Sequence, residues 1–225
     1  LDLYPPGQFA TFLTNHDQER VMSNLRGDVG AAKTAASLLL TGPGVPFLYY
    51  GEEIGMMGRK PDERIRTPMQ WTNDPVTAGF TRAEQPWQRL ADDGLDFSVA
   101  AQTDDPDSLL SHYRALIHLR NGHAALRTGS YLPVSSASRR VYAVVRQSAD
   151  ETLLVLVNLD RNPVTDYALR WPQGSLSAEA EAAPLYGVPA DAALAPLTIN
   201  ALGGFDAYQP LPELGARQTV ILRLG

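Results

Sequence analysis

Two short apolar runs enclose a helical stretch near the start of the chain. Residues 9–13 and 45–50 lack the polar alternation of a half-exposed strand, which is typical of parallel strands covered on both faces. Between them, residues 29–40 carry small and apolar side chains at helical spacing, and the Thr-Gly-Pro-Gly sequence at 41–44 favours a helix stop. A strand, a helix and a strand at this spacing predict a βαβ unit.

The sequence from residue 51 to residue 105 has no regular periodicity and holds many of the Pro, Gly, Trp and Arg residues. A connection of this length inside a compact domain is uncommon unless it is functional. Residues 107–121 then follow helical periodicity, with Asp105 or Asp107 as the candidate N-cap.

From about residue 128 the pattern changes to short apolar or alternating runs that turn residues separate. This pattern is typical of an antiparallel β-sandwich. The change predicts a first domain of residues 1–126 and a second domain of residues 127–225. The strands expected in the second domain are residues 131–134, 141–146, 153–159, 167–169, 197–199 and 219–224.

The amino-acid composition restricts the classes of partner that the protein is expected to bind. The chain has 225 residues, of which 44% are hydrophobic and 20% charged, so it can bury a core. Its net charge of −6 argues against nucleic acid or an anionic membrane and fits a neutral or cationic ligand. No run approaches the roughly 20 apolar residues of a membrane helix. The chain has no cysteine, which excludes disulfide chemistry and leaves the compartment open, with an extracellular location slightly favoured over a cytoplasmic one.

Polar side chains directly follow both apolar runs. Asn15, His16 and Asp17 come after the first run, and Gly51-Glu52-Glu53 comes after the second. Because parallel strands of a βαβ unit present their carboxyl ends at one edge, where functional residues gather, we expect these groups to lie near each other. An ordinary loop is the alternative interpretation of the Asn-His-Asp sequence.

Three segments resemble the α-amylase superfamily of glycoside hydrolases. Residues 12–17 (Phe-Leu-Thr-Asn-His-Asp) resemble its fourth sequence motif, and residues 44–56 resemble its eighth barrel strand. Residues 66–71 (Arg-Thr-Pro-Met-Gln-Trp) resemble the segment after that strand in α-glucosidases, oligo-1,6-glucosidases and trehalose synthases. The β-rich tail is similar to the C-terminal sandwich domain of the family.

The resemblance implies an α/β plus all-β fold: the C-terminal portion of a (β/α)8 barrel, from strand 7 to helix 8, followed by an antiparallel β-sandwich. The other motifs of the family are not found among the 225 residues, neither the Gly-Phe-Arg-x-Asp nucleophile motif nor a strand ending in the acid/base Glu. We therefore expect the chain to be the C-terminal part of a longer enzyme and to be inactive in isolation.

Retaining glycoside hydrolases use a carboxylate nucleophile and a carboxylic acid about 5–5.5 Å apart, around an oxocarbenium-like transition state. The resemblance implies that Asp17 is a third required carboxylate. It would accept hydrogen bonds from the sugar hydroxyls next to the anomeric carbon, and these bonds strengthen as the ring gains positive charge. His16 would donate to the same sugar edge, while Asn15 would bind substrate or brace the loop.

The irregular stretch holds further candidates, each with a structural alternative. Arg66 is expected to contact the substrate or a substrate-binding carboxylate, or to form an ion pair with Asp62 or Glu63. Trp71 and Trp87 could stack on sugar faces, and buried packing is the expectation for at least one of them.

No metal site is expected in this chain. His112, His118 and His123 do not share a helical face, and one of Glu52 and Glu53 is expected to cap or brace the neighbouring loop. The resemblance allows calcium in the intact enzyme, held mostly by parts of the family that this sequence does not contain.

The sequence leaves three functions open. The first is hydrolysis of α-glucosidic bonds in starch-like or malto-oligosaccharide substrates, as in α-amylases. The second is the activity of an α-glucosidase, an oligo-1,6-glucosidase or a transglycosylase similar to trehalose synthase. The third is a non-catalytic carbohydrate-binding or assembly module. Expected partners are an α-glucan or oligosaccharide, and either the N-terminal part of the barrel or a second copy that covers the exposed barrel edge.

Overall fold

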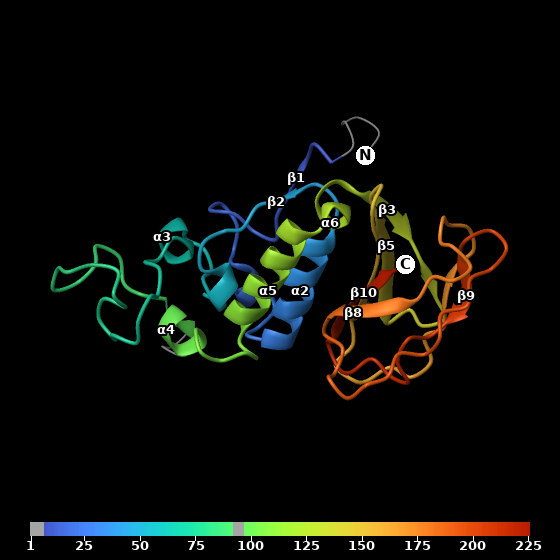
Figure 1. Cartoon of the computed structure of the whole chain (residues 1–225). Coiled ribbons are helices and arrows are strands. Elements are labelled where there is room, and N and C mark those ends of the chain that lie inside the picture. The colour runs from blue at the N-terminus through green and yellow to red at the C-terminus, as the bar shows by residue number, and fades with distance from the viewer. Residues whose placement is uncertain (1–6, 92–96) are drawn as a thin grey trace. The chain divides into compact units, whose positions relative to one another are not determined.

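The computed structural model describes residues 7–91 and 97–225. It divides into two compact units (Figure 1). The first unit comprises Leu1–Leu39 and Val45–Leu119, and the second comprises Leu40–Gly44 and Arg120–Gly225. The domain boundary expected between residues 126 and 127 remains a prediction.

The first unit is built around a short parallel strand pair and two longer helices. Strands β1 and β2 pair in parallel, with Ala10 opposite Val45. The helix predicted at 29–40 is confirmed as α2, and the helix predicted at 107–121 is confirmed as α5. The elements are β1 (Ala10–Thr11), α1 (Val21–Asn24), α2 (Val29–Thr41), β2 (Val45–Pro46), the 3-10 helix η1 (Glu52–Ile54), α3 (Asp62–Ile65), α4 (Val99–Gln102) and α5 (Leu109–Gly122).

The prediction of two strands covered on both faces is not met by the described residues. The regular strands are only two residues long, and the side chains of Phe12, Val45 and Phe47 are 46%, 53% and 59% exposed. A parallel strand becomes buried only when further strands and helices pack against both of its faces. Among the residues that the structure describes, β1 and β2 have only each other as sheet partners.

A polar contact joins α2 to α5 inside the first unit. The Nε2 atom of His112 lies 3.0 Å from the Ser37 hydroxyl and 2.9 Å from the Lys33 carbonyl. Burial lowers the pKa of His112 to about 4, so the imidazole is neutral at physiological pH.

The expectation that Asp105 or Asp107 caps α5 is wrong. The helix begins at Leu109, so the capping position belongs to Ser108, whose hydroxyl accepts from the Ser111 N–H at 3.1 Å. The Asp105 carboxylate instead accepts from the N–H of Asp107 at 2.8 Å.

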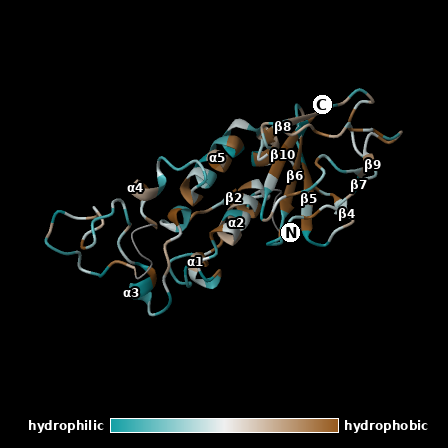
Figure 2. Ribbon diagram, turned by 90° about the horizontal axis from the view of Figure 1, so that it is seen from below, coloured by the Kyte–Doolittle hydropathy of each residue, from teal (hydrophilic) through white to brown (hydrophobic). Residues whose placement is uncertain are grey.

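The second unit contains two antiparallel sheets that share one hydrophobic core. One sheet has the order β3-β5-β6-β10-β8 and the other β4-β7-β9. Leu154 and Leu156 of the larger sheet and Phe205 and Tyr208 of the smaller sheet belong to the same buried cluster. Figure 2 shows hydrophobic residues along β5, β6 and β10. The strands are β3 (Ser130–Pro133), β4 (Ser135–Ser136), β5 (Val141–Gln147), β6 (Thr152–Asn158), β7 (Leu169–Trp171), β8 (Ala182–Tyr186), β9 (Phe205–Tyr208) and β10 (Thr219–Leu224), preceded by helix α6 (Ala124–Thr128).

Most of the strands expected here are confirmed, but several elements differ. Residues 197–199 do not form a strand, although Leu197 packs against the core. Strand β8 lies instead in an Ala-rich stretch without clear alternation, since this edge strand has half-buried and exposed residues but no fully buried one. Strand β9 was not expected either, and β7 begins two residues later than the predicted run at 167–169.

Two buried arginines satisfy the carbonyl groups at the end of α2. Arg120 donates to the carbonyls of Leu40 at 2.8 Å and Gly42 at 3.0 Å, and Arg146 donates to the carbonyl of Thr41. A helix C-terminus leaves such carbonyls without helical partners, so these bonds anchor residues 40–44 to the second unit.

In the part of the chain that the structure describes, no helix is both long and apolar enough to cross a membrane.

Candidate active site

The loop after β1 is fixed by one of its own side chains. The Asn15 carboxamide oxygen accepts from the Asp17 N–H at 2.9 Å, and the Asn15 carbonyl accepts from the Gln18 N–H at 3.2 Å. This is an Asx turn, in which the side chain takes the place of a backbone acceptor. Asn15 therefore braces the loop, one of its two expected roles.

The turn presents His16 and Asp17 outward. Their side chains are 66% and 64% exposed, and the His16 Nε2 atom lies 3.4 Å from Asp17 Oδ2. The pair offers a carboxylate acceptor beside an imidazole nitrogen on a fixed backbone. Such a pair can bind the hydroxyl groups of a polar ligand.

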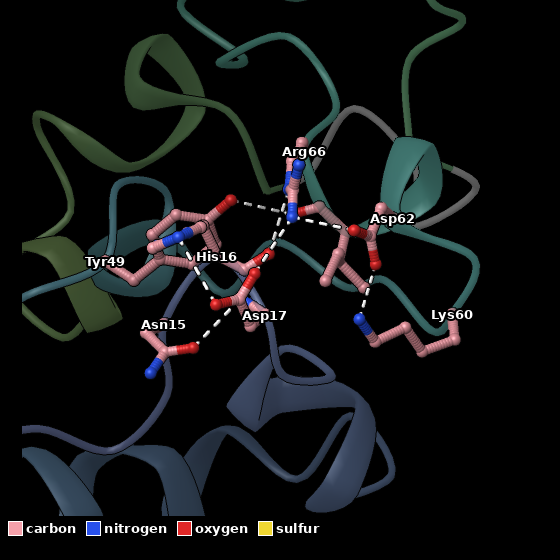
Figure 3. Close-up of polar contacts among 8 residues, drawn as sticks. Asn15, His16, Asp17, Tyr49, Lys60, Asp62 and Arg66 are labelled. Carbon is pink, nitrogen blue, oxygen red and sulfur yellow. Dashed lines mark hydrogen bonds and ion pairs between the residues drawn. The ribbon is translucent and has the colours of Figure 1, made fainter.

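Arg66 bridges this loop to α3. Its Nη2 donates to Asp17 Oδ1 at 3.0 Å and to Asp62 Oδ2 at 2.8 Å, while its Nε donates to the His16 carbonyl at 2.9 Å. Figure 3 shows Arg66 between the two aspartates, with Lys60 on the far side of Asp62. The hydrogen bond from Lys60, followed by the Arg66 charge, holds the pKa of Asp62 below its ordinary value. We call His16, Asp17, Lys60, Asp62 and Arg66 the charged cluster.

The ion pair expected between Arg66 and Asp62 is therefore present, and Arg66 also pairs with Asp17. The structure thus brings the four sequence-predicted site residues together. Three follow β1 directly, and Arg66 reaches them from the irregular stretch after β2.

Two tyrosines at the end of β2 position the backbone on either side of Arg66. Tyr49 donates its hydroxyl to the Ile65 carbonyl at 3.0 Å, and Tyr50 donates to the Thr67 carbonyl at 2.6 Å. Burial raises the pKa of Tyr49 to about 12, so its hydroxyl keeps the proton that it donates.

Arg20 packs against both of these tyrosines and is almost fully buried. Its guanidinium carbon is 4.7 Å from the centroid of each tyrosine ring, and its Nη1 donates to the Tyr50 carbonyl at 2.7 Å. Cation–π contacts of this kind are strengthened by burial. The sequence analysis missed Arg20, Tyr49 and Tyr50 as supports of the site, although the two tyrosines directly precede the Gly51 that ends the second apolar run.

Glu52, one of the two glutamates expected to cap or brace the neighbouring loop, lies two positions after Tyr50. It accepts from the Tyr113 hydroxyl at 2.9 Å and from the Thr14 hydroxyl at 3.4 Å. Burial is the main reason that the pKa of Glu52 rises to about 7, and the pKa of Glu53 is also raised by burial.

The remaining candidates lie outside the charged cluster. Trp71 and Trp87 are 51% and 79% exposed, so the expectation that at least one of them is buried is not met in this chain. The described residues contain no group of three or more His, Asp or Glu side chains that could bind a metal ion.

Comparison with protein families finds a match over more than half of the chain. The family model described as alpha amylase, catalytic domain, matches residues 4–129. The matched segment contains the whole charged cluster together with Arg20, Tyr49, Tyr50 and Glu52.

Individual relatives and solved structures agree with this match. Alpha-amylase 3 of Dictyoglomus thermophilum is 39% identical over 152 residues, which is 68% of this chain and 30% of the relative. An oligo-1,6-glucosidase of Heyndrickxia coagulans is 29% identical over 205 residues, covering 73% of this chain and 37% of the relative. The crystal structure of the alpha-amylase from H. orenii superposes with a TM-score of 0.74 and 33% identity, over 96% of this chain and 40% of that one. The chain thus spans about a third of the length of these two curated relatives.

Proposed function

The chain belongs to the alpha-amylase family of glycoside hydrolases, and from this premise we propose that it supplies Asp17 as the transition-state-stabilising carboxylate of a retaining enzyme. The observation that carries the proposal is the placement of Asp17. Its carboxylate is exposed at the end of β1, with one oxygen near His16 and the other bonded to Arg66.

The proposed chemistry needs a carboxylate that is held in place before the substrate arrives. Arg66 and the Asx turn hold the Asp17 loop, so little reorganisation is required when the sugar binds. Hydroxyl groups next to the anomeric carbon donate to Asp17 and become stronger donors as positive charge develops on the ring. Because these bonds strengthen in the transition state, they accelerate the reaction and do not merely tighten substrate binding. His16 lies beside Asp17 and would contact the same sugar edge.

We further propose that the first unit is the part of a (β/α)8 barrel from strand 7 to helix 8, and that the second unit forms an antiparallel β-sandwich. The parallel pairing of β1 and β2 around α2 supports the barrel assignment. The exposed side chains of Phe12, Val45 and Phe47 support a partner that covers these strands. The preceding barrel strands would be that partner in the intact enzyme, and a second copy would be the alternative.

The proposed substrates are starch-like glucans or malto-oligosaccharides, cleaved at α-glucosidic bonds. A second candidate is an oligo-1,6-glucosidase or another α-glucosidase or transglycosylase, favoured by the Arg-Thr-Pro-Met-Gln-Trp segment that carries Arg66. Analysis of the products from starch, maltose and isomaltose separates the two. A non-catalytic carbohydrate-binding module is the third candidate, and it predicts binding without turnover in the intact protein.

The decisive experiment compares Asp17→Asn with Asp62→Asn in the enzyme that contains this chain. Both substitutions remove one carboxylate partner of Arg66, but only the first removes the carboxylate proposed to contact the sugar. We expect Asp17→Asn to lower kcat by about 100- to 1000-fold, the scale of losing one preorganised electrostatic group, and Asp62→Asn to lower it much less. Equal effects of the two substitutions would contradict the assignment of Asp17.

The 225-residue chain by itself is expected to show no turnover of starch, maltose or isomaltose. The reason is that retaining hydrolysis requires a nucleophile and an acid/base carboxylate whose motifs the sequence does not contain. Measurable release of reducing sugar by the purified chain would refute this part of the proposal.

A further inference from the structure

Glu52 is a buried carboxyl group that lies between two hydroxyl groups from distant segments. Its side chain in η1 is 3% exposed. The Tyr113 hydroxyl of α5 donates to Oε1 at 2.9 Å, and the Thr14 hydroxyl donates to Oε2 at 3.4 Å. Thr14 directly precedes Asn15, so these contacts connect α5 to the loop that carries Asp17.

Packing alone does not require an ionisable group at this position. Ile54 and Met56, close by in the sequence, are fully buried apolar residues of a local core cluster. Burial of a carboxylate is costly, and an apolar side chain is the usual occupant of a fully buried position. A strongly perturbed acid next to a candidate active site is therefore a candidate for a functional role.

We propose that Glu52 is a positioning residue, which fixes the loop of Asn15, His16 and Asp17 through the Thr14 hydroxyl and does so most firmly when it is ionised. This inference rests on the proposed function only in taking the Asp17 loop to be part of the active site. The hydrogen bonds that carry it are independent of catalysis.

The strength of the hydrogen bonds from Tyr113 and Thr14 depends on whether Glu52 is ionised. A carboxylate accepts at both oxygens, whereas protonation turns one oxygen into a hydroxyl that is a poor acceptor. Tyr113 and Thr14 contact Glu52 with hydroxyl groups, and the charges of Glu53 and Arg20 also act on it. Burial and Glu53 raise the pKa of Glu52 while the Tyr113 and Thr14 bonds and Arg20 lower it, leaving it at about 7. The bond to Thr14 is thus expected to weaken as the pH falls through neutrality.

Hydrogen exchange of the Asp17 and Gln18 amides in the 225-residue chain tests the proposal directly. Both amides bond to Asn15 within the loop, and their exchange needs no turnover. The variants are Glu52→Gln, which cannot ionise, and Glu52→Ala, which removes both acceptors. Glu63→Gln makes the same change at an exposed position of α3 and is the matched control. Exchange of the α2 amides reports whether each variant is folded.

After correction for intrinsic exchange rates, we expect the parent to protect the two loop amides about tenfold more at pH 8 than at pH 6. Glu63→Gln should match the parent, and Glu52→Gln should lose the pH dependence while α2 stays protected. Glu52→Ala should lower protection at both pH values. Loop protection that is independent of pH in the parent, or that keeps its pH dependence in Glu52→Gln, would overturn the proposal.

The two proposals can fail separately. An active Asp17→Asn enzyme would refute the catalytic role of Asp17 and leave the exchange result standing. Unchanged exchange in the Glu52 variants would refute only the positioning role.

Discussion

The apolar runs of the two units share their apolar character and differ in their surroundings. Strand β6 is buried at every residue: it pairs with β5 on one side and β10 on the other, and its Leu154 and Leu156 side chains enter a core shared by two sheets. The apolar run that contains β2 pairs only with β1, and its Val45 and Phe47 side chains are more than half exposed. An apolar run therefore indicates that its side chains must be buried, but the segments that bury them lie elsewhere.

The largest expected effect tests the burial difference directly. Leu154 of β6 is fully buried in the shared core, so Leu154→Ala should lower the free energy of unfolding of the second unit by about 2–5 kcal/mol. Phe47→Ala removes a larger side chain but one that is mostly exposed, and should change stability by less than about 0.5 kcal/mol. Urea denaturation followed by circular dichroism measures both. An equally large loss for Phe47→Ala would mean that the apolar run containing β2 is covered in solution.

An intermediate effect is expected from two buried titratable groups of the first unit. Burial raises the pKa of Glu52 from 4.5 to about 7 and lowers the pKa of His112 from 6.5 to about 4. Ionised Glu52 therefore costs stability increasingly as the pH rises from about 4.5 to 7. Neutral His112 stabilises the fold above pH about 6.5, and this contribution is lost as the pH falls toward 4. Each group contributes on the order of 3 kcal/mol, since one pKa unit corresponds to about 1.4 kcal/mol.

In the parent the two contributions oppose each other on acidification, and Glu52→Gln removes one of them. We expect this variant to be more stable than the parent at pH 8 and to lose stability as the pH falls from 6.5 to 4. A higher free energy of unfolding is compatible with a looser Asp17 loop. The cost of burying the charge acts on the stability of the whole unit, whereas the bond to Thr14 acts only on the loop. Thermal unfolding at several pH values, with Glu63→Gln as the control, measures the difference. Parallel pH profiles for the parent and Glu52→Gln would contradict the expectation.

The smallest effect on folding, and the most informative about partners, concerns the uncovered strands. We expect the isolated chain to self-associate through β1 and β2, and Phe47→Ser to weaken that association with little change in stability. Trp87→Ser is the matched control, because Trp87 is even more exposed but lies in the irregular stretch. Analytical ultracentrifugation gives the average mass of each protein. A monomeric parent, or equal effects of the two variants, would count against cover by a second copy.

Much of the fold was predictable because local patterns determine local structure. The helices at α2 and α5 and the strands β3, β5, β6 and β10 follow from periodicity and turn residues. The cap of α5 was misassigned because three polar residues compete within four positions, and the helix start decides among them. Strand β8 was missed since an edge strand pairs through its backbone and needs no buried side chains.

The residue pattern alone identifies the groups that can do chemistry: a polar Asn15-His16-Asp17 segment after an apolar run, and an arginine at position 66. The three-dimensional structure was needed to see how these groups are arranged. It showed that Asn15 turns inward to the backbone, that Arg66 bonds to Asp17, and that Glu52 contacts Thr14 and Tyr113. The physical reason is that residues 49 positions apart in the chain meet only when the fold brings two strand ends together. The environments that orient a carboxylate and shift its pKa arise from those long-range contacts and not from its sequence neighbours.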